Sequence, residues 1–271
     1  MALTEVQKGI VRRLAANRSD TSYVAGGIVL NRDWPRVSDD VDIFHDTDEE
    51  IGASAQRDIE TLRSAGYRVH VDVEVYGCVE ATVLKNDEGT LIQWMSETRN
   101  RFFPLIRDEE WGARLHSADL AVNKVLAASS RTKPRDFVDL VMIEQNMCPL
   151  GPLVMAASGK PPHFSPQRVI DEMRRRGLSI ADEQYDTVRG LPAGWTAALI
   201  RENLMRALDA AERYILAAPV EIVGALAVDA EGVAVEVSAL DDAGVVLKRA
   251  TAEPEVMPMI ADFVQSWGRK P

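Results

Sequence analysis

The sequence YVAGGIVLNRDWPRVSDDVDIFHD, residues 23–46, contains both the strand on which we expect the fold to be built and the first candidate chemistry. Its last part, residues 40–44, alternates between acidic and apolar side chains, which is the pattern of a half-buried strand. Alternation places Asp40 and Asp42 on one face, and the valine and isoleucine that follow them on the other. We therefore predict a strand that packs on a core through its apolar face and presents two carboxylates on its opposite face.

Two glycines, Gly26 and Gly27, precede these aspartates. Adjacent carboxylates repel each other and are costly to desolvate unless a cation lies between them, and oxygen ligands suit a hard ion such as Mg²⁺. A glycine pair lets the backbone approach a polyphosphate closely and donate its amide groups. Taken alone, the two aspartates fit a solvated strand end, and the glycine pair fits a plain turn. Together, with the glycines before the aspartates, they indicate a nucleotide-and-metal site.

This arrangement, Gly-Gly followed by a short helix and Ser38-x-Asp40-x-Asp42, resembles the opening motif of the polymerase-β-like nucleotidyltransferases. That superfamily normally has a third carboxylate on a later strand, and none is obvious here, since Gln93 stands at the first place to look. Three glutamates are further candidates: Glu74, Glu80 and Glu97. Two aspartates suffice for one metal ion, whereas a two-metal site needs the extra negative charge.

A second group of candidate site residues lies on two predicted helices. The second of these helices begins at Pro134. On the first helix, Lys124 stands in a stripe of small apolar residues that ends at Arg131. On the second, Asp136 and Asp139 share a face at a spacing of three. A lysine on such a stripe that pointed into a cleft would neutralise triphosphate charge. The alternative for the two aspartates is a set of surface ion pairs.

The motifs Asp-Leu-Ala-x-x-Lys-x-x-Ala at residues 119–127 and Arg-Asp-x-x-Asp-Leu at residues 135–140 are similar to those of the AbiEii/AbiGii-type toxin branch of the same superfamily. The resemblance covers about residues 20–145. It implies transfer of a nucleotide from a nucleoside triphosphate with Mg²⁺. Some members modify the acceptor end of transfer RNA and are paired with an antitoxin protein, so both are implied as partners.

The resemblance also implies a role for each matching residue. The implied magnesium ligands are Asp40 and Asp42. The implied nucleotide contacts are Gly26, Gly27, Ser38, Lys124, Arg131 and Arg135. Catalytic roles would also fall to Lys124, Asp136 and Asp139, either aspartate acting as a base or orienting Lys124 and Arg131.

Length, net charge and cysteine content limit the possible domain organisation, partners and location of the protein. A chain of 271 residues has room for one large or two moderate domains. Its net charge of −11 argues against a broad, non-specific nucleic-acid surface, but one structured RNA could still bind a local basic patch. Cys78 and Cys148 lack metal-type spacing and fit reduced thiols. With neither a secretory signal nor a membrane-spanning run, we expect a cytoplasmic protein.

The remaining pattern predicts an α/β fold. Residues 1–145 should form a small mixed nucleotidyltransferase sheet with flanking helices, and residues 146–271 a helical segment with a small β-rich C-terminal part. The predicted helices are 4–17, 48–65, 118–130, 165–176, 196–217 and 255–267. The predicted strands are 67–75, 79–84 and 90–95, a hairpin of 220–228 with 233–240, and an added strand at 244–249, while 149–162 reads as loop-rich.

Several features have two interpretations. The pair Phe102-Phe103 is a core plug or a nucleic-acid contact, and His45 is structural or contacts a phosphate. The run Arg174-Arg175-Arg176 interacts with its helix dipole or binds RNA. For the whole chain, the alternatives to RNA-directed transfer are a nucleotidyltransferase for a small molecule such as an antibiotic, and a catalytically inactive relative that only binds nucleotides.

Overall fold

The computed structural model describes residues 3–257, and these form two compact units. Unit 1 runs to Arg99 and includes Leu105–His116, whereas unit 2 consists of Asn100–Pro104 and the chain from Ser117 onward. The predicted boundary after residue 145 falls inside unit 2. Within the described range, no helix combines the length and apolarity needed to cross a membrane.

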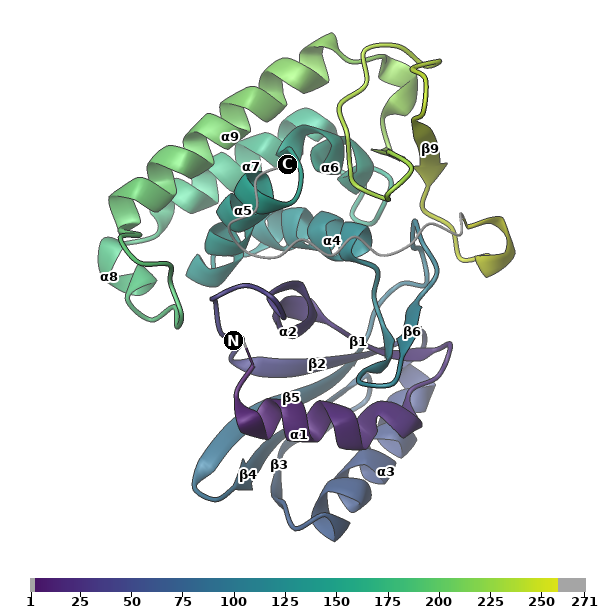
Figure 1. The fold of residues 1–271 in the computed structure, drawn as a ribbon, viewed down its shortest axis with the longest axis vertical. Coiled ribbons are helices and arrows are strands. Elements are labelled where there is room, and N and C mark those ends of the chain that lie inside the picture. The colour runs from purple at the N-terminus through teal and green to yellow at the C-terminus, as the bar shows by residue number, and fades with distance from the viewer. Residues whose placement is uncertain (1–2, 258–271) are drawn as a thin grey trace. The chain divides into compact units, whose positions relative to one another are not determined.

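Unit 1 is built on a mixed sheet of seven strands in the order β3-β4-β5-β2-β1-β7-β6 (Figure 1). The strands are β1 (Ser22–Ala25), β2 (Asp40–His45), β3 (Arg68–Val75), β4 (Cys78–Lys85), β5 (Glu88–Ser96), β6 (Ile106–Asp108) and β7 (Gly112–Arg114). The central strand β2 is antiparallel to β1 and parallel to β5. The helices are α1 (Glu5–Leu14), α2 (Gly26–Leu30) and α3 (Ile51–Ser64), with 3₁₀ turns η1 (Ala15–Asn17) and η2 (Asp48–Glu50). The predicted mixed α/β fold is therefore confirmed.

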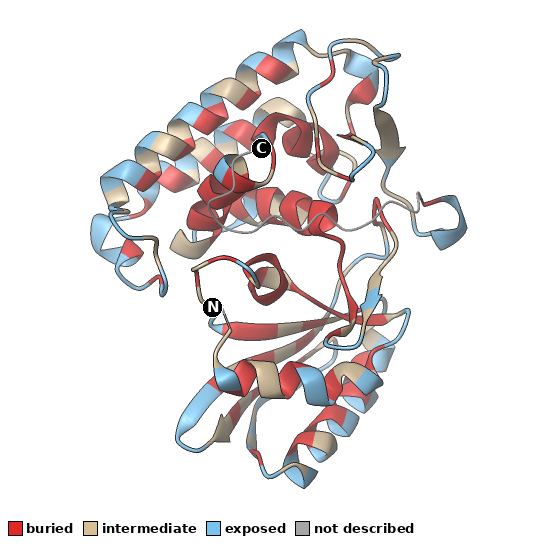
Figure 2. Cartoon of the chain, viewed as in Figure 1, coloured by how far each residue is buried: buried red, intermediate tan, exposed pale blue. Residues whose placement is uncertain are grey.

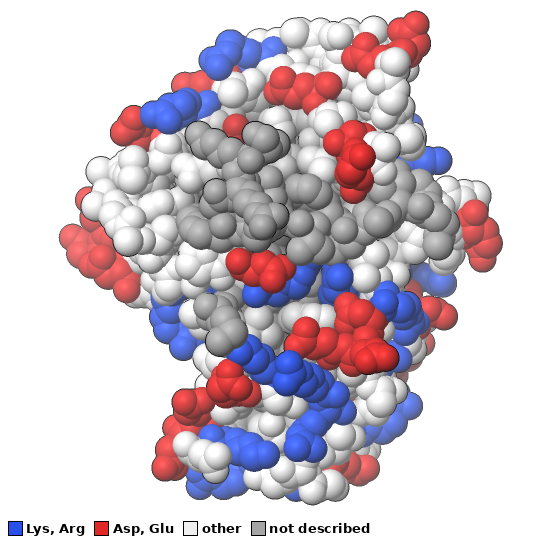
Figure 3. Space-filling model, viewed as in Figure 1, with Lys and Arg blue, Asp and Glu red and all other residues white. Residues whose placement is uncertain are grey.

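The apolar face of β2 forms part of the core of unit 1. Val41 and Ile43 are buried there together with one stripe each from α1 and α3 (Figure 2). Helix α1 starts with a capping box in which Thr4 and Gln7 satisfy each other's backbone amides. Its opposite side is solvated, and Figure 3 shows basic side chains gathered over this helix on the visible face.

A buried ion pair lies in the same core. Arg18 and Asp58 are fully buried, with Nη2 2.5 Å from a carboxylate oxygen. Asp58 also accepts hydrogen bonds from Trp94 Nε1 at 2.8 Å and Asn17 Nδ2 at 2.8 Å. The pair links the end of the first helical segment to α3 and β5. His45 lies on this face too, and burial, with the nearby Arg18, lowers its pKa to about 4.

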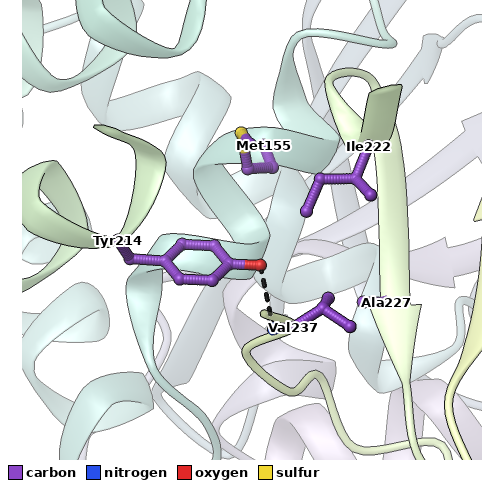
Figure 4. Packing of buried hydrophobic residues seen from close by; sticks show 5 residues of the cluster. All are labelled: Met155, Tyr214, Ile222, Ala227 and Val237. Carbon is purple, nitrogen blue, oxygen red and sulfur yellow. Dashed lines mark hydrogen bonds between the residues drawn. The ribbon is translucent and has the colours of Figure 1, made fainter. Parts of the chain in front are cut away.

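Unit 2 is mainly helical and carries a two-stranded sheet. Its helices are α4 (Ser117–Ser130), α5 (Pro134–Asn146), α6 (Leu150–Ala157), α7 (Pro166–Ser179), α8 (Asp182–Tyr185) and α9 (Ala197–Ala217), with η3 (Val220–Ile222) and η4 (Pro254–Val256). The strands are β8 (Ala225–Val228) and β9 (Val246–Arg249). Figure 4 shows how Met155 and Tyr214 pack against the strand region, where the Tyr214 hydroxyl accepts the amide of Val237 at 3.2 Å.

Two predictions about unit 2 hold only in part. The hairpin of 220–228 with 233–240 is present only next to its turn, where Val228 bridges Ala234 and the amide of Val235 donates to the carbonyl of Ala227 at 3.0 Å. Further along, Asp242 accepts the amides of Ser238 and Ala239, and β8 forms its ladder with β9. Part of the loop-rich stretch is the buried helix α6, whose Pro152 lies in the first turn, where a missing amide does no harm. The predicted strand at 244–249 is present as β9. Most of the predicted terminal helix lies outside the described residues.

The short segment Asn100–Pro104 belongs to unit 2 although it interrupts unit 1 in the sequence. Asp119, buried in the first turn of α4, accepts the amides of Phe102 at 3.0 Å and Phe103 at 3.0 Å. Lys160 Nζ donates to the same carboxylate at 2.8 Å. Both phenylalanines are buried, which favours the core interpretation of this pair.

Candidate active site

The register of β2 positions the two aspartates. Asp42 lies opposite Ala25 on β1 and Gln93 on β5, and Asp40 lies opposite Leu91 on β5. Directly opposed residues share a face of the sheet, so both carboxylates are on the face away from the buried valine and isoleucine of β2. Asp40 is 6% exposed and accepts a hydrogen bond from Ser38 Oγ at 3.2 Å. The alternation of the sequence thus produces a polar face at the centre of the sheet.

The two glycines make room for the side chains of this site. Gly26 has φ +71°, and a Cβ there would overlap the carboxylate of Asp42. A Cβ on Gly27 would lie 2.5 Å from Arg36 Nη2 and 2.9 Å from Ser38 Oγ. Glycine is thus required here by contacts within the chain itself. Nucleotide contact by Gly26, Gly27 and Ser38 stays a prediction.

Arg36 lies beside the glycine pair, and it was not among the residues predicted for the site. Its side chain is buried against Gly27, and its Nη1 donates to the carbonyl of Val37 at 3.1 Å. The carbonyl of Ser38 accepts a hydrogen bond from Gln7 Nε2 at 2.9 Å, so α1 also holds this connection. In the sequence Arg36 stands just before Ser-x-Asp-x-Asp. Its contact with the glycine pair depends on the path of the loop, which the local sequence pattern does not predict.

The structure distinguishes the candidates for a third carboxylate. Glu80 on β4 lies opposite Gln93, on the same face as Asp42, and accepts the Gln93 side-chain amide at 2.5 Å. Neighbouring strands are about 4.8 Å apart, which puts the Glu80 backbone about 10 Å from that of Asp42. Glu74 on β3 lies opposite Val79 on β4, which in turn lies opposite the buried Trp94 on β5. Glu74 is therefore on the core face of the sheet, away from Asp42. Glu97 follows the end of β5.

Among residues 3–257, no group of three or more Asp, Glu, His or Cys side chains has an arrangement suited to a metal ion. The donors at the centre of the sheet are therefore the two carboxylates of Asp40 and Asp42. Mg²⁺ is commonly held by one or two carboxylates, with waters and substrate phosphates completing its coordination. The oxygen donors of Asp40 and Asp42 fit that ion.

In unit 2, the two predicted helices bring their charged residues together. Lys124 Nζ on α4 lies 3.2 Å from Asp136 Oδ1 and 2.8 Å from Asp139 Oδ2 on α5. Arg131 binds Asp136 through Nε at 2.7 Å and Nη2 at 3.0 Å. Both aspartates are completely buried, whereas the Arg131 side chain is 44% exposed. Asp136 thus holds both cations in place.

The arrangement also sets the charge state of Asp136. Burial alone would raise the pKa of its carboxyl, but Lys124 and Arg131 outweigh that effect and lower the pKa to about 2. The pKa of this carboxyl is thus lower in the folded state, so it stabilises the fold above its unfolded value near 4. That stabilisation is lost as the pH falls through about 2.

We therefore expect the free energy of unfolding to fall by about 2 kcal/mol between pH 4 and pH 2 on account of this one group. The measurement is urea denaturation at a series of pH values, for the wild-type chain and for Asp136→Asn, which cannot titrate at this position. The variant should show a shallower pH dependence in this window. Parallel curves for the two proteins would contradict the assignment.

Arg135 is half-buried in the first turn of α5, directly before Asp136. Its predicted contact with a nucleotide stays a prediction, as does the expectation that Lys124 faces the two aspartates of β2. His45, by contrast, lies on the core face of β2, where Ser22 Oγ is 3.1 Å from its Nε2. Its buried position there fits the structural interpretation.

Comparison with known proteins gives structural neighbours but no sequence match. No protein-family model and no curated protein matches the sequence. The structure is similar to MenT4, a nucleotidyltransferase toxin from Mycobacterium tuberculosis, with a TM-score of 0.50 and 16% identity over 77% of this chain and 84% of that one. A protein from H. pylori assigned as a nucleotidyltransferase aligns with a TM-score of 0.47 and 13% identity, over 78% of this chain and 94% of that one. The likeness to MenT4 is one of fold, and it agrees with the predicted α/β architecture.

Proposed function

We propose that the protein transfers a nucleoside monophosphate from a nucleoside triphosphate to an acceptor hydroxyl. The observation that carries this proposal is the polar face of β2, where Asp40 and Asp42 lie side by side with Asp42 packed on Gly26, within a fold shared with MenT4. The two aspartates would hold Mg²⁺. When bound there, the ion offsets negative charge on the phosphates and lowers the pKa of the acceptor hydroxyl.

The residues of this chain would position the reactants. Ser38 fixes the orientation of the Asp40 carboxylate through its hydroxyl. The Lys124 ammonium has three donors, of which the two aspartates of α5 take two, so one can serve a phosphate. In the reaction the acceptor oxygen bonds to the α-phosphorus and the bond to the bridging oxygen breaks, so that pyrophosphate leaves as the acceptor releases its proton.

Of the two roles predicted for the aspartates of α5, orientation fits Asp136 better than base catalysis. A carboxylate with its pKa near 2 takes up a proton only weakly at neutral pH. Its two ion pairs are those of a residue that holds Lys124 and Arg131 in place. For Asp139, both roles stay open as predictions.

We further propose that the acceptor is RNA and that the protein is an AbiEii/AbiGii-type toxin with an antitoxin partner. The motifs at residues 119–127 and 135–140 support this finer proposal, as does the description of MenT4 as a toxin. A small-molecule acceptor is the main alternative.

Labelled nucleoside triphosphates, incubated with the protein and Mg²⁺ in the presence of either total RNA or aminoglycosides, test both statements. We expect label to enter RNA of discrete size and to require the ion. Label in the aminoglycoside would identify a small-molecule enzyme. If neither acceptor is labelled, calorimetric titration with the triphosphate decides, because Mg²⁺-dependent binding without transfer would identify an inactive relative.

A further inference from the structure

We propose that the polar face of strands β4 and β5 binds the 3′-terminal nucleoside of the RNA acceptor. The residues that would hold it, here called the acceptor subsite, are Glu80 and Gln93 with the neighbouring Leu91 and Met95. The inference rests on the proposed transfer to RNA, and it names the place where the attacking end of that RNA would lie.

The glycine pair and the acceptor subsite lie on opposite sides of Asp42. Strand β2 lies between β1 and β5, and Asp42 is opposite Ala25 on β1 and Gln93 on β5. The glycine pair directly follows β1, and Gly26 packs on the Asp42 carboxylate. In phosphoryl transfer the attacking and leaving oxygens are roughly in line across the reacting phosphorus. If pyrophosphate leaves on the side of the glycines, the acceptor therefore approaches over β5.

On this side of Asp42 the polar face of the sheet is accessible, in contrast to the core face. The core-facing residues of β4 and β5, such as Ala81 and Trp94, are completely buried. In the described chain, the residues at the alternate positions of these two strands are all partly exposed. They include Cys78, Glu80, Thr82 and Leu84 on β4, and Leu91, Gln93 and Met95 on β5.

Glu80 and Gln93 form a polar pair that can make further hydrogen bonds. Gln93 Nε2 donates to Glu80 Oε1 at 2.5 Å, and within residues 3–257 this is the one hydrogen bond that either side chain makes. A carboxylate accepts at both oxygens, and a primary amide has a second N–H and a carbonyl oxygen. A ligand can therefore donate to Glu80, and can exchange hydrogen bonds in both directions with Gln93.

Charge decides which part of an RNA fits this pair. Among the described residues no cation forms an ion pair with Glu80, so its carboxylate would repel the phosphates of the RNA backbone. The 3′-terminal ribose carries two free hydroxyl groups in place of a further phosphate, and hydroxyl donors bind a carboxylate strongly. Leu91 and Met95, two residues before and after Gln93, add apolar contact for the sugar and base. The subsite thus fits an RNA that ends in free hydroxyls.

The test measures how the protein distinguishes two RNA ends in the absence of a triphosphate. The probe is a short fluorescein-labelled RNA, prepared once with 3′-terminal hydroxyls and once with a 3′-phosphate, and titrated by anisotropy. The variant Glu80→Gln removes the charge but still offers Gln93 an acceptor. The matched control is Glu74→Gln, which removes the same charge from the neighbouring strand β3 on the opposite face of the sheet.

We expect the wild-type chain to bind the hydroxyl end more tightly than the phosphate end, on the order of tenfold. Glu80→Gln should reduce this preference about threefold or more, because it removes both the repulsion of the phosphate and the charge-assisted hydrogen bond. The control should keep the preference, and equal thermal melts of all three proteins would show that the fold is kept. Equal preference in all three, or none in the wild-type chain, would overturn the proposal.

The outcome is separable from that of the proposed reaction, because the binding test contains no triphosphate. An end preference that depends on Glu80, in a chain that labels no acceptor, would support the acceptor subsite and contradict the transfer activity. Equal labelling of RNA by the wild-type chain and Glu80→Gln, with unchanged end preference, would support the transfer activity and overturn the acceptor subsite.

Discussion

Asp42→Ala is expected to lower the rate of nucleotidyl transfer about 10³-fold or more while leaving the fold intact. Charge stabilisation of a transferring phosphoryl group by a bound ion is worth several kcal/mol, and each 1.4 kcal/mol is about a factor of ten in rate. Asp42 lies on the polar face of β2 rather than among the core residues, so its removal takes away the proposed metal ligand without opening the core. The measurement is incorporation of labelled monophosphate under single-turnover conditions.

The matched control is Asp39→Ala. Asp39 is an exposed carboxylate in the same segment, directly before the strand, so its loss changes the net charge equally. It should retain most of the transfer rate, and far-ultraviolet circular dichroism should be the same for both variants. Retained activity in Asp42→Ala would remove this residue from the mechanism.

Asp58→Ala is expected to lower the free energy of unfolding by about 3–5 kcal/mol, because it leaves the Arg18 guanidinium buried without its carboxylate. The same substitution removes the acceptor of the Trp94 indole. Natural domains are stable by only about 5–15 kcal/mol, so the loss is a large part of the total. Urea denaturation followed by tryptophan fluorescence measures it.

A surface ion pair in the same unit provides the comparison. Asp20 pairs with Arg107 and is almost fully exposed, so Asp20→Ala should change stability little. If the two variants unfolded at the same urea concentration, the buried pair would not hold unit 1 together as we infer.

Local sequence patterns predicted which side chains share one face of a single strand or helix. The alternation around Asp40 and Asp42 predicted a polar and an apolar face, and the structure has both. The spacing along the two helices of residues 117–146 predicted that Asp136 and Asp139 share a face, and both contact Lys124. In each case the period of one element determines which side chains lie together.

Features that depend on the path of the chain were not predicted. Arg18 and Asp58 are 40 residues apart, and nothing in either local pattern points to the other. Arg36 reaches Gly27 only because the loop folds back. The predicted hairpin in the C-terminal part is longer than the observed one, because the side chain of Asp242 accepts the amides of Ser238 and Ala239, and a hydrogen bond of that kind leaves no periodic signal.

The position of Asn100–Pro104 has a consequence for dissecting the molecule. Because unit 2 takes this segment from between two strands of unit 1, the chain passes from one unit to the other three times. No single cut can therefore yield two intact fragments. A fragment ending at His116 would contain Phe102 and Phe103 but would lack Asp119 and Lys160, which contact this segment. The two rings would then form an exposed apolar surface that promotes aggregation.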